Sequence, residues 1–291
     1  METDRRKFMM LSSSVVVSLL ACIQRVSAAS NSDAAHKPVP QRQPGIAELP
    51  FHLQIMDMMK LKNRIKAISN VFEVGDQQAD YSYIEDLDYG RGLTVTSYGF
   101  CTCNSEVTDI IKFYDPLAPG NGLGPFLPFL PPAQESLTKE RFAEFSNVWG
   151  EETKLSNILR EVCEKYADQL YFDPAVKFAK EAKISTPIGV SIIYDTLLQH
   201  GGGDDEDSLS AIYQRTVAQT GWPHVGSEAD FLRAMLEMRR ADLTNPQNTD
   251  TAEVWRESVP RIDALLELLK SNPELQPPLH VRNEEVSVTI L

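Results

Sequence analysis

Residues 73–100 read EVGDQQADYSYIEDLDYGRGLTVTSYGF, and the interpretation of the whole chain starts from them. It opens with Glu73, which directly follows an apolar segment of helical periodicity over residues 51–72. Asp88 lies fifteen residues later, just before the turn signal Gly90-Arg91-Gly92. Residues 93–98 then alternate β-branched and aromatic side chains, which predicts a strand. The stretch therefore predicts two carboxylates carried by separate elements.

Two carboxylates that face each other across a cleft can hydrolyse a glycosidic bond. One is kept protonated and donates its proton to the leaving oxygen, while the other activates water or attacks the sugar. Glu73 suits the acid, because a helix C-terminus and the apolar neighbour Phe72 both disfavour a charged carboxylate. On spacing alone, a plainer interpretation is a solvated helix end at Glu73 and a turn capped by the acids at 85, 86 and 88.

Further motifs follow this stretch in order. The first two motifs are YSYIEDLDYGRGLT at 81–94 and GFCT at 99–102. The later ones are YDPLAPGN at 114–121, LYFDPAV at 170–176, YD at 194–195 with HG at 200–201, FL at 231–232 with LEMR at 236–239, and PPL at 277–279. Ordered agreement of this kind is more specific than any single motif. Over residues 50–280 the chain resembles the family 46 chitosanases, with weak correspondence after residue 245.

This resemblance implies a lysozyme-like fold, mainly α (α+β), with two mostly helical lobes and a small β-sheet flanking a substrate cleft. The apolar pattern agrees, because it predicts helices over 106–114, 140–147, 152–171, 174–182, 188–198, 208–220, 228–243 and 252–269. Alternation at Val286, Val288 and Ile290 predicts one late strand. Residues 116–132 hold six prolines and three glycines, so we expect a loop or a very short helix there.

The resemblance also implies catalytic roles. Glu73 matches the general acid, and Thr94 matches the threonine that holds the attacking water. The family's base is an Asp that directly precedes Gly-Arg-Gly, but Tyr89 occupies that position here and Asp88 lies one residue earlier. We expect Asp88 to be the base. The alternatives are substitution by one of the acids Glu85 and Asp86, or a weak or inactive enzyme.

The positions that match sugar-binding residues of the family are Tyr83, Arg91, Glu106, Tyr171 and His200. Arg91 lies next to the expected base, where a cation favours an ionised carboxylate. Glu106 stands where the family has Asp, so its reach toward a substrate ammonium is longer. Structural support is expected from Glu85, Asp86, Asp195 and Arg239, the last two as an interior ion pair. A second arginine of that network has no clear match, and we expect Arg256.

The implied activity is inverting, internal cleavage of β-1,4-linked glucosamine polymer (chitosan), with no metal and no cofactor. A peptidoglycan-cleaving muramidase or lytic transglycosylase is an alternative, since the implied fold and export suit both. A non-catalytic chitosan-binding protein is another, because Tyr89 occupies the usual base position.

Composition limits the partners of this chain of 291 residues. A formal net charge of −13 disfavours nucleic acid and anionic membrane and favours a polycationic ligand. We expect a monomer. The cysteines outside the N-terminal segment are Cys101, Cys103 and Cys163, which allow at most one internal disulfide, and we expect buried thiols.

The N-terminal segment has the features of an export signal. The pair Arg5-Arg6 precedes an apolar run and the small residues 27–29, so residues 1–29 are predicted to be a twin-arginine-like signal peptide. A rival interpretation is a lipoprotein signal that leaves Cys22 lipidated. Residues 30–46 read as a flexible leader, and 47–291 as a single catalytic domain of two lobes. We therefore expect a secreted or periplasmic protein.

Overall fold

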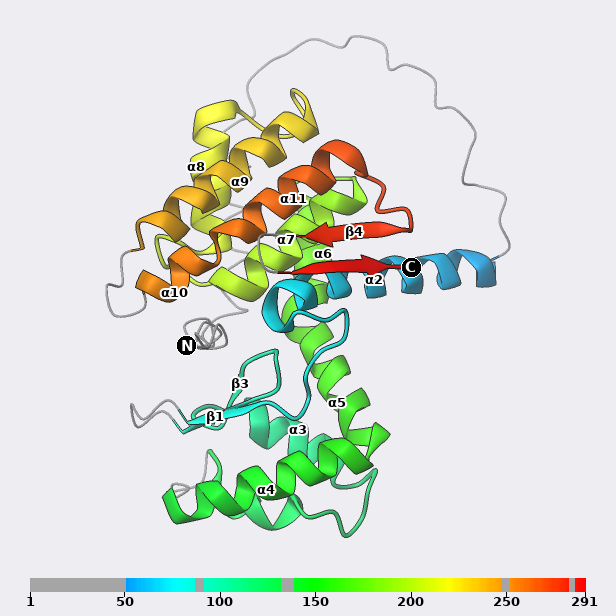
Figure 1. The fold of residues 1–291 in the computed structure, drawn as a ribbon, viewed down its shortest axis with the longest axis vertical. Helices are drawn as coiled ribbons and strands as arrows, with labels where there is room; N and C mark the ends of the chain where they lie inside the picture. The colour runs from blue at the N-terminus through cyan, green and yellow to red at the C-terminus, as the bar shows by residue number, and fades with distance from the viewer. Residues whose placement is uncertain (1–50, 87–91, 132–138, 247–251, 283–285) are drawn as a thin grey trace.

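The computed structural model describes residues 51–86, 92–131, 139–246, 252–282 and 286–291. Its elements form two groups (Figure 1), and the predicted mainly helical fold with a small sheet is confirmed. The smaller group contains β1 (Ile84–Asp86), β2 (Leu93–Val95), β3 (Phe100–Cys101), α3 (Glu106–Tyr114), the 3-10 helix η2 (Gly124–Phe129) and α4 (Lys139–Leu155).

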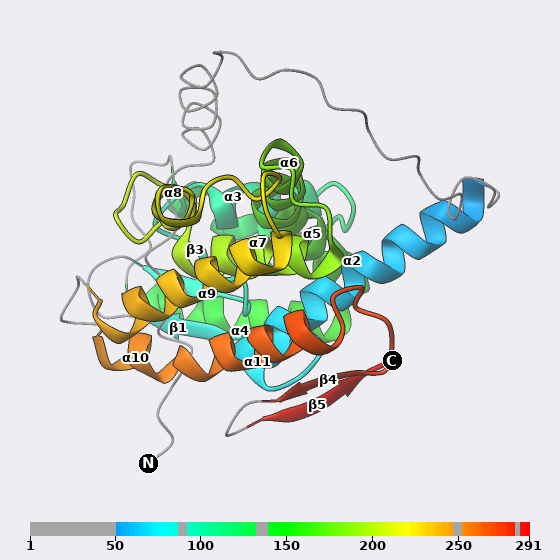
Figure 2. The same ribbon diagram turned by 90° about the horizontal axis from the view of Figure 1, so that it is seen from above.

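The larger group contains α2 (Phe51–Val74), α6 (Asp173–Glu181), α7 (Pro187–His200), α8 (Leu209–Thr220), α9 (Glu228–Thr244), α10 (Ala252–Glu257), α11 (Val259–Ser271), β4 (Leu279–Arg282) and β5 (Ser287–Ile290). The two groups are joined by α5 (Asn157–Ala167), which continues into the π-helical segment η3 (Asp168–Phe172). Seen from above, α11 lies between α9 and the β4–β5 hairpin (Figure 2).

Helix α2 carries the predicted acid in its last turn. It ends at Val74, because Gly75 adopts the left-handed conformation (φ 72°) and its N–H bonds to the Val71 carbonyl at 3.1 Å. Glycine tolerates this conformation and commonly ends helices. The helical periodicity over 51–72, which allowed one helix or two, is thus confirmed as one helix that ends two residues later.

The small sheet is antiparallel in the order β1-β2-β3. Glu85 lies opposite Thr94, and Thr94 lies opposite Cys101. Directly opposed residues share a face of a sheet, so these three side chains lie on one side. The strand predicted over 93–98 is shorter than expected, because residues 96–99 form a turn in which the Gly99 N–H bonds to the Thr96 carbonyl at 3.1 Å.

Helix α7 forms the centre of the larger group. It contacts α2, α6, α8, α9 and α11, and nearly all of its residues are buried. A helix that is apolar around most of its circumference suits such a position. It also carries the buried polar residues Asp195, Thr196, Gln199 and His200, which need partners inside the protein.

Two predicted helix boundaries are wrong. The helices predicted over 140–147 and 152–171 instead meet at Ser156, whose hydroxyl accepts from the Leu159 N–H at 3.2 Å and caps α5. The helix predicted over 252–269 is divided at Ser258 into α10 and α11. The late strand is confirmed as β5, and it pairs with β4, which the pattern did not predict. No helix among the described residues is long and apolar enough to cross a membrane.

Candidate active site

Glu73 makes a buried ion pair. Nη2 of Arg261 on α11 donates to its Oε1. The side chain of Arg261 is 5% exposed, and that of Glu73 is 8% exposed. The Phe72 ring lies under the same guanidinium, 5.1 Å from its carbon. The sequence predicted only an apolar neighbour for this carboxylate. The structure corrects this expectation, since a cation lies against the proposed acid.

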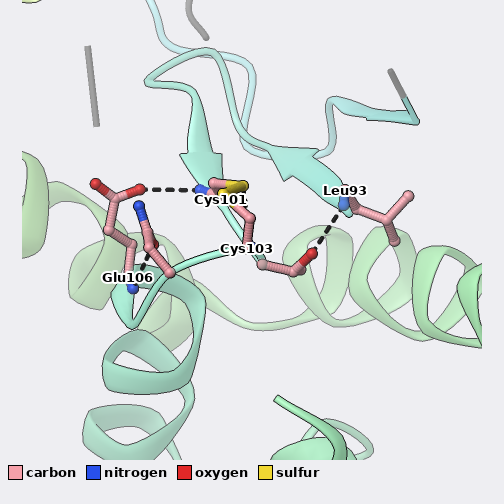
Figure 3. The surroundings of a disulfide bond; sticks show 6 residues. Leu93, Cys101, Cys103 and Glu106 are labelled. Atoms are coloured by element: carbon pink, nitrogen blue, oxygen red, sulfur yellow. Dashed lines mark hydrogen bonds between the residues drawn. A yellow bond between two sulfur atoms is a disulfide. The ribbon is translucent and has the colours of Figure 1, made fainter. Parts of the chain in front are cut away.

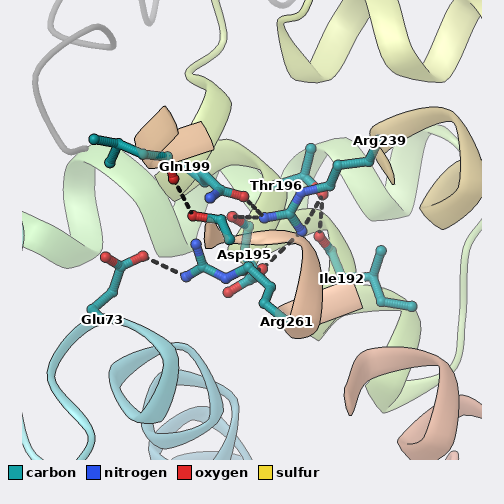
Figure 4. Close-up of polar contacts among 9 residues, drawn as sticks. Glu73, Ile192, Asp195, Thr196, Gln199, Arg239 and Arg261 are labelled. Atoms are coloured by element: carbon teal, nitrogen blue, oxygen red, sulfur yellow. Dashed lines mark hydrogen bonds and ion pairs between the residues drawn. The ribbon is translucent and has the colours of Figure 1, made fainter. Parts of the chain in front are cut away.

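Arg261 is shared with a second carboxylate. Its Nε lies 3.3 Å from Oδ2 of Asp195, and Nη1 of Arg239 lies 2.7 Å from the same oxygen. Asp195 and Arg239 are both completely buried. Figure 4 shows how Glu73, Arg261, Asp195 and Arg239 follow one another, with the glutamate at one end. We call these four residues the charge network.

The charge network is balanced, with two guanidinium groups and two carboxylates. Arg239 is fixed further by bonds to the Gln199 side chain and to the Thr196 hydroxyl at 3.3 Å. Burial alone would raise the pKa of Asp195, but the Arg261 and Arg239 charges outweigh it and hold that pKa below its usual value. Burial lowers the pKa of Arg239 to about 10, so the group remains charged at neutral pH.

The interior ion pair expected at Asp195 and Arg239 is thus present. The expected second arginine is wrong, because Arg256 lies on the surface and its Nε donates to the Thr244 carbonyl at 3.2 Å. Arg261 takes that place. A signal for it exists in the sequence, since Arg261 shares a helical face with Leu265, Leu268 and Leu269. An arginine on an apolar face needs a buried acidic partner.

His200 lies at the end of α7, beside the charge network. Its side chain is buried, and its ring centroid lies 4.9 Å from that of Trp255 in an edge-to-face arrangement. Burial, followed by the charges of Arg239 and Arg261, holds the pKa of His200 well below its usual value. The ring is therefore neutral at pH 7. Its role in sugar binding stays a prediction.

A second set of predicted residues lies on the sheet. Thr94 is buried in the centre of β2 and faces Glu85 across the β1–β2 pair. The Tyr83 hydroxyl donates to the Glu85 carboxylate, while Asp86 is exposed at the end of β1. The structure thus brings Tyr83, Glu85 and Thr94 together. The predicted Asp88 and Arg91, and Tyr89 between them, lie outside the described residues.

Glu106 begins α3 beside the sheet. Its Oε2 accepts from the Cys101 N–H at 2.9 Å, and its own N–H bonds to the Asn104 side chain at 2.8 Å (Figure 3). Burial raises the pKa of Glu106, although hydrogen bonds to its carboxylate from the Cys101 N–H and from the Asn104 side chain oppose the shift. The thiols expected at Cys101 and Cys103 are instead joined in a disulfide, and Cys163 is free and buried.

Tyr171 lies in the π-helical segment η3 and is largely buried. Its hydroxyl donates to the Tyr98 carbonyl at 3.4 Å, so it contacts the turn that follows β2. Short π-helical segments are frequent at functional sites. The contact places Tyr171 close to the sheet that carries Thr94, and its role in substrate binding stays a prediction.

A cavity of about 790 Å³ lies elsewhere, between residues 78–82 and helices α4 and α5. None of the predicted site residues lines it. In the part of the chain that the structure describes, no three His, Cys, Asp or Glu side chains are grouped as metal ligands would be.

Residues 67–279 match the family described as Glycosyl hydrolase family 46. The chain is 36% identical over 232 residues to a chitosanase of Bacillus subtilis (strain 168), which covers 77% of this chain and 82% of the relative. It is 31% identical over 207 residues to a chitosanase of Streptomyces sp. (strain N174), covering 70% and 72%.

Solved structures agree. The fold is similar to that of the family 46 chitosanase of Gynuella sunshinyii in complex with chitotetraose, with a TM-score of 0.70 and 32% identity over 80% of this chain and 98% of that one. A mutant chitosanase of Bacillus subtilis MY002 complexed with six GlcN gives a TM-score of 0.71 and 34% identity with the same coverage.

Proposed function

The chain belongs to glycosyl hydrolase family 46, and we propose on this basis that it is a chitosanase, an endo-acting hydrolase of β-1,4-linked glucosamine polymer. The observation that carries the proposal is its similarity to chitosanases over most of its length. Two of the similar structures hold glucosamine oligomers. The comparisons do not support the muramidase, transglycosylase or non-catalytic alternatives.

The proposed reaction inverts the configuration at the anomeric carbon. Glu73 gives its proton to the oxygen of the leaving sugar as the glycosidic C–O bond breaks. A water held by Thr94 attacks from the opposite face and loses a proton to Asp88. This arrangement needs carboxyl groups roughly 6.5–9.5 Å apart, so that the water fits between them.

The charge network sets a condition on this role for Glu73, because the Arg261 guanidinium lies against its carboxylate. An ionised carboxylate cannot donate a proton, so Glu73 must be protonated when the sugar chain is bound. Protonation removes the counterion on one side of Arg261, but Asp195 remains 3.3 Å from its Nε. Because Arg261 keeps a partner, the proton can reach Glu73 without leaving an unpaired cation in the interior. Asp195 is thus a positioning residue for the acid.

Electrostatics suit the substrate. Protonated glucosamine units carry an ammonium group, and the protein has a net charge of −13. Glu85 on β1 and Glu106 beside the sheet would supply acceptors for ammonium and hydroxyl groups. An acidic protein attracts such a polymer over distances set by the ionic strength.

We extend the proposal to export and assembly. Residues 1–29 would direct export and be removed, leaving a secreted or periplasmic monomer whose residues 47–291 form one catalytic domain. Mass spectrometry of the exported protein tests this, since its first residue is expected to be Ser30. A lipid on Cys22 would contradict release.

The assay for the activity compares chitosan with peptidoglycan. Wild-type protein is expected to release reducing ends from chitosan and none from peptidoglycan, and Glu73→Gln is expected to abolish the release while keeping the fold. Cleavage of peptidoglycan, or binding of chitosan without cleavage by the wild type, would refute the proposal.

A further inference from the structure

Glu164 on α5 joins three other segments of the chain. Its Oε1 accepts from the hydroxyls of Tyr81 at 2.6 Å and Tyr98 at 2.5 Å, and its Oε2 accepts from Nζ of Lys66. Tyr81 precedes β1, Tyr98 lies in the turn between β2 and β3, and Lys66 lies on α2. No residue of this group has a role in the reaction described above.

A neighbouring carboxylate extends the link to α2. Asp168, one helical turn after Glu164, accepts from Nζ of Lys66 at 2.8 Å and from Nζ of Lys62. Two lysines four residues apart on α2 therefore face two carboxylates four residues apart on α5 and η3. Nζ of Lys66 also lies 5.2 Å from the Tyr98 ring centroid. The group fixes α2 against α5 at two successive turns.

The hydrogen bonds of this group are of a strong class. The donors Lys66 and Tyr98 are 5% and 2% exposed, while the accepting Glu164 side chain is 33% exposed. Burial alone would raise the pKa of Glu164, but Lys66 and then the two tyrosine hydroxyls outweigh it and lower that pKa. Burial raises the pKa of Tyr98 well above its usual value, so its hydroxyl stays a donor. Hydrogen bonds to an ionised carboxylate are shorter and stronger than neutral ones.

The Glu164 group lies between the helix and the sheet that carry the proposed catalytic residues. Lys66 lies seven residues before Glu73, which is two turns along the same face of α2. Tyr98 follows Thr94 by four residues, and its turn is tied to the segment before β1, because the N–H groups of residues 96 and 97 bond to the carbonyls of residues 83 and 80 at 2.8 and 2.7 Å. Glu164 thus connects the helix that bears the proposed acid with the sheet that bears the proposed water-holding residue.

We propose that Glu164 is a positioning residue of the chitosanase reaction. Through its bonds to Tyr81 and Tyr98, it holds the β1–β3 sheet in a fixed position relative to α2. In this proposal it acts through these bonds and not on the reacting atoms. Its bonds set where Thr94 stands relative to Glu73. This inference rests on the proposed function.

The test removes the two bonds to the sheet and keeps the rings. Tyr81→Phe and Tyr98→Phe, alone and together, are compared with Lys62→Met, which breaks a contact of the same ionic group but none to the sheet. Kinetics on a glucosamine hexamer are measured well below the melting temperature of each variant. A misplacement of about 1 Å can cost on the order of 100-fold in rate, so the double variant is expected to lose at least roughly tenfold in kcat with little change in KM.

Lys62→Met is expected to keep the wild-type kcat even where it lowers the melting temperature. Glu164→Gln, which retains an acceptor oxygen for the tyrosines, is expected to keep more activity than Glu164→Ala. A purely stabilising role would lower the melting temperature of the tyrosine variants and leave kcat unchanged, and that result would overturn the inference. Should the double variant not fold, the two single variants decide by the same criterion. A wild type that does not cleave the hexamer would instead refute the proposed function.

Discussion

The substitution Asp195→Asn tests the energetics of the charge network most sharply. It removes one of two negative charges and hardly changes the size of the side chain. Two guanidinium groups would then face Glu73 alone. Arg239, completely buried and 2.7 Å from Asp195, would lose its carboxylate partner in an interior that water does not reach.

The expected loss of stability is large. Removing one partner of a buried pair costs about 3–5 kcal/mol, because the other charge is left uncompensated. For a chain of this size, each kcal/mol corresponds to a shift of about 2–4 °C in the melting temperature, which predicts a fall of about 6–20 °C.

The contribution of Asp195 to stability depends on pH in a defined direction. The Arg261 and Arg239 charges hold the pKa of Asp195 below its usual value in the folded protein. Its contribution is therefore complete above the pKa of the unfolded chain, about 3.9, and is lost as the pH falls through the folded value. The difference between wild type and variant is expected to be constant near neutral pH and to shrink below about pH 4.

Urea unfolding followed by circular dichroism measures the difference. The matched control is Asp263→Asn, since Asp263 pairs with Arg240 at 2.6 Å on the surface and is 66% exposed. Exposed pairs contribute about 0–1 kcal/mol. Equal unfolding midpoints for the two variants would refute the reasoning.

Three further outcomes are expected. Arg261→Met is expected to lower kcat on chitosan by on the order of 100-fold, whereas Arg256→Met is expected to leave it unchanged, because only the first contacts Glu73 in the described structure; equal reducing-end release by both would contradict this. Burial lowers the pKa of His200, so below about pH 6.5 the unfolded chain gains a proton that the folded chain does not, and stability falls. Urea unfolding over a pH series is expected to show that the unfolding free energy of His200→Gln depends less steeply on pH than that of the wild type; parallel slopes for the two proteins would argue against it. Added salt is expected to raise KM for chitosan, because it screens the attraction between a protein of charge −13 and a polycation; a KM independent of salt would exclude such steering.

Much of the architecture follows from local patterns in the sequence. The apolar period before Glu73 predicts α2, and the turn signal with its β-branched run predicts β2. The boundary at Ser156 is missed because helical periodicity continues on both sides of it. The strand Leu279–Arg282 is missed because four alternating residues give too weak a signal without their partner strand.

The charge network shows what a local pattern cannot provide. Arg261 reaches Glu73 across 188 positions of the chain, and no spacing rule connects residues so far apart. The ion pair between Asp195 and Arg239 could be predicted only from the resemblance to a family. Likewise, whether Cys101 and Cys103 are thiols or a disulfide depends on how the chain turns at β3, which the spacing leaves open.

The pairing of Glu73 with Asp88 is the central claim, and the activity of Asp88→Asn on chitosan tests it most directly, with Tyr89→Phe as the control at the neighbouring position. General acid–base catalysis contributes roughly 10²–10⁴-fold, so kcat of Asp88→Asn is expected to fall by at least about 100-fold while Tyr89→Phe stays active. Wild-type kcat in Asp88→Asn would remove this carboxylate from the mechanism.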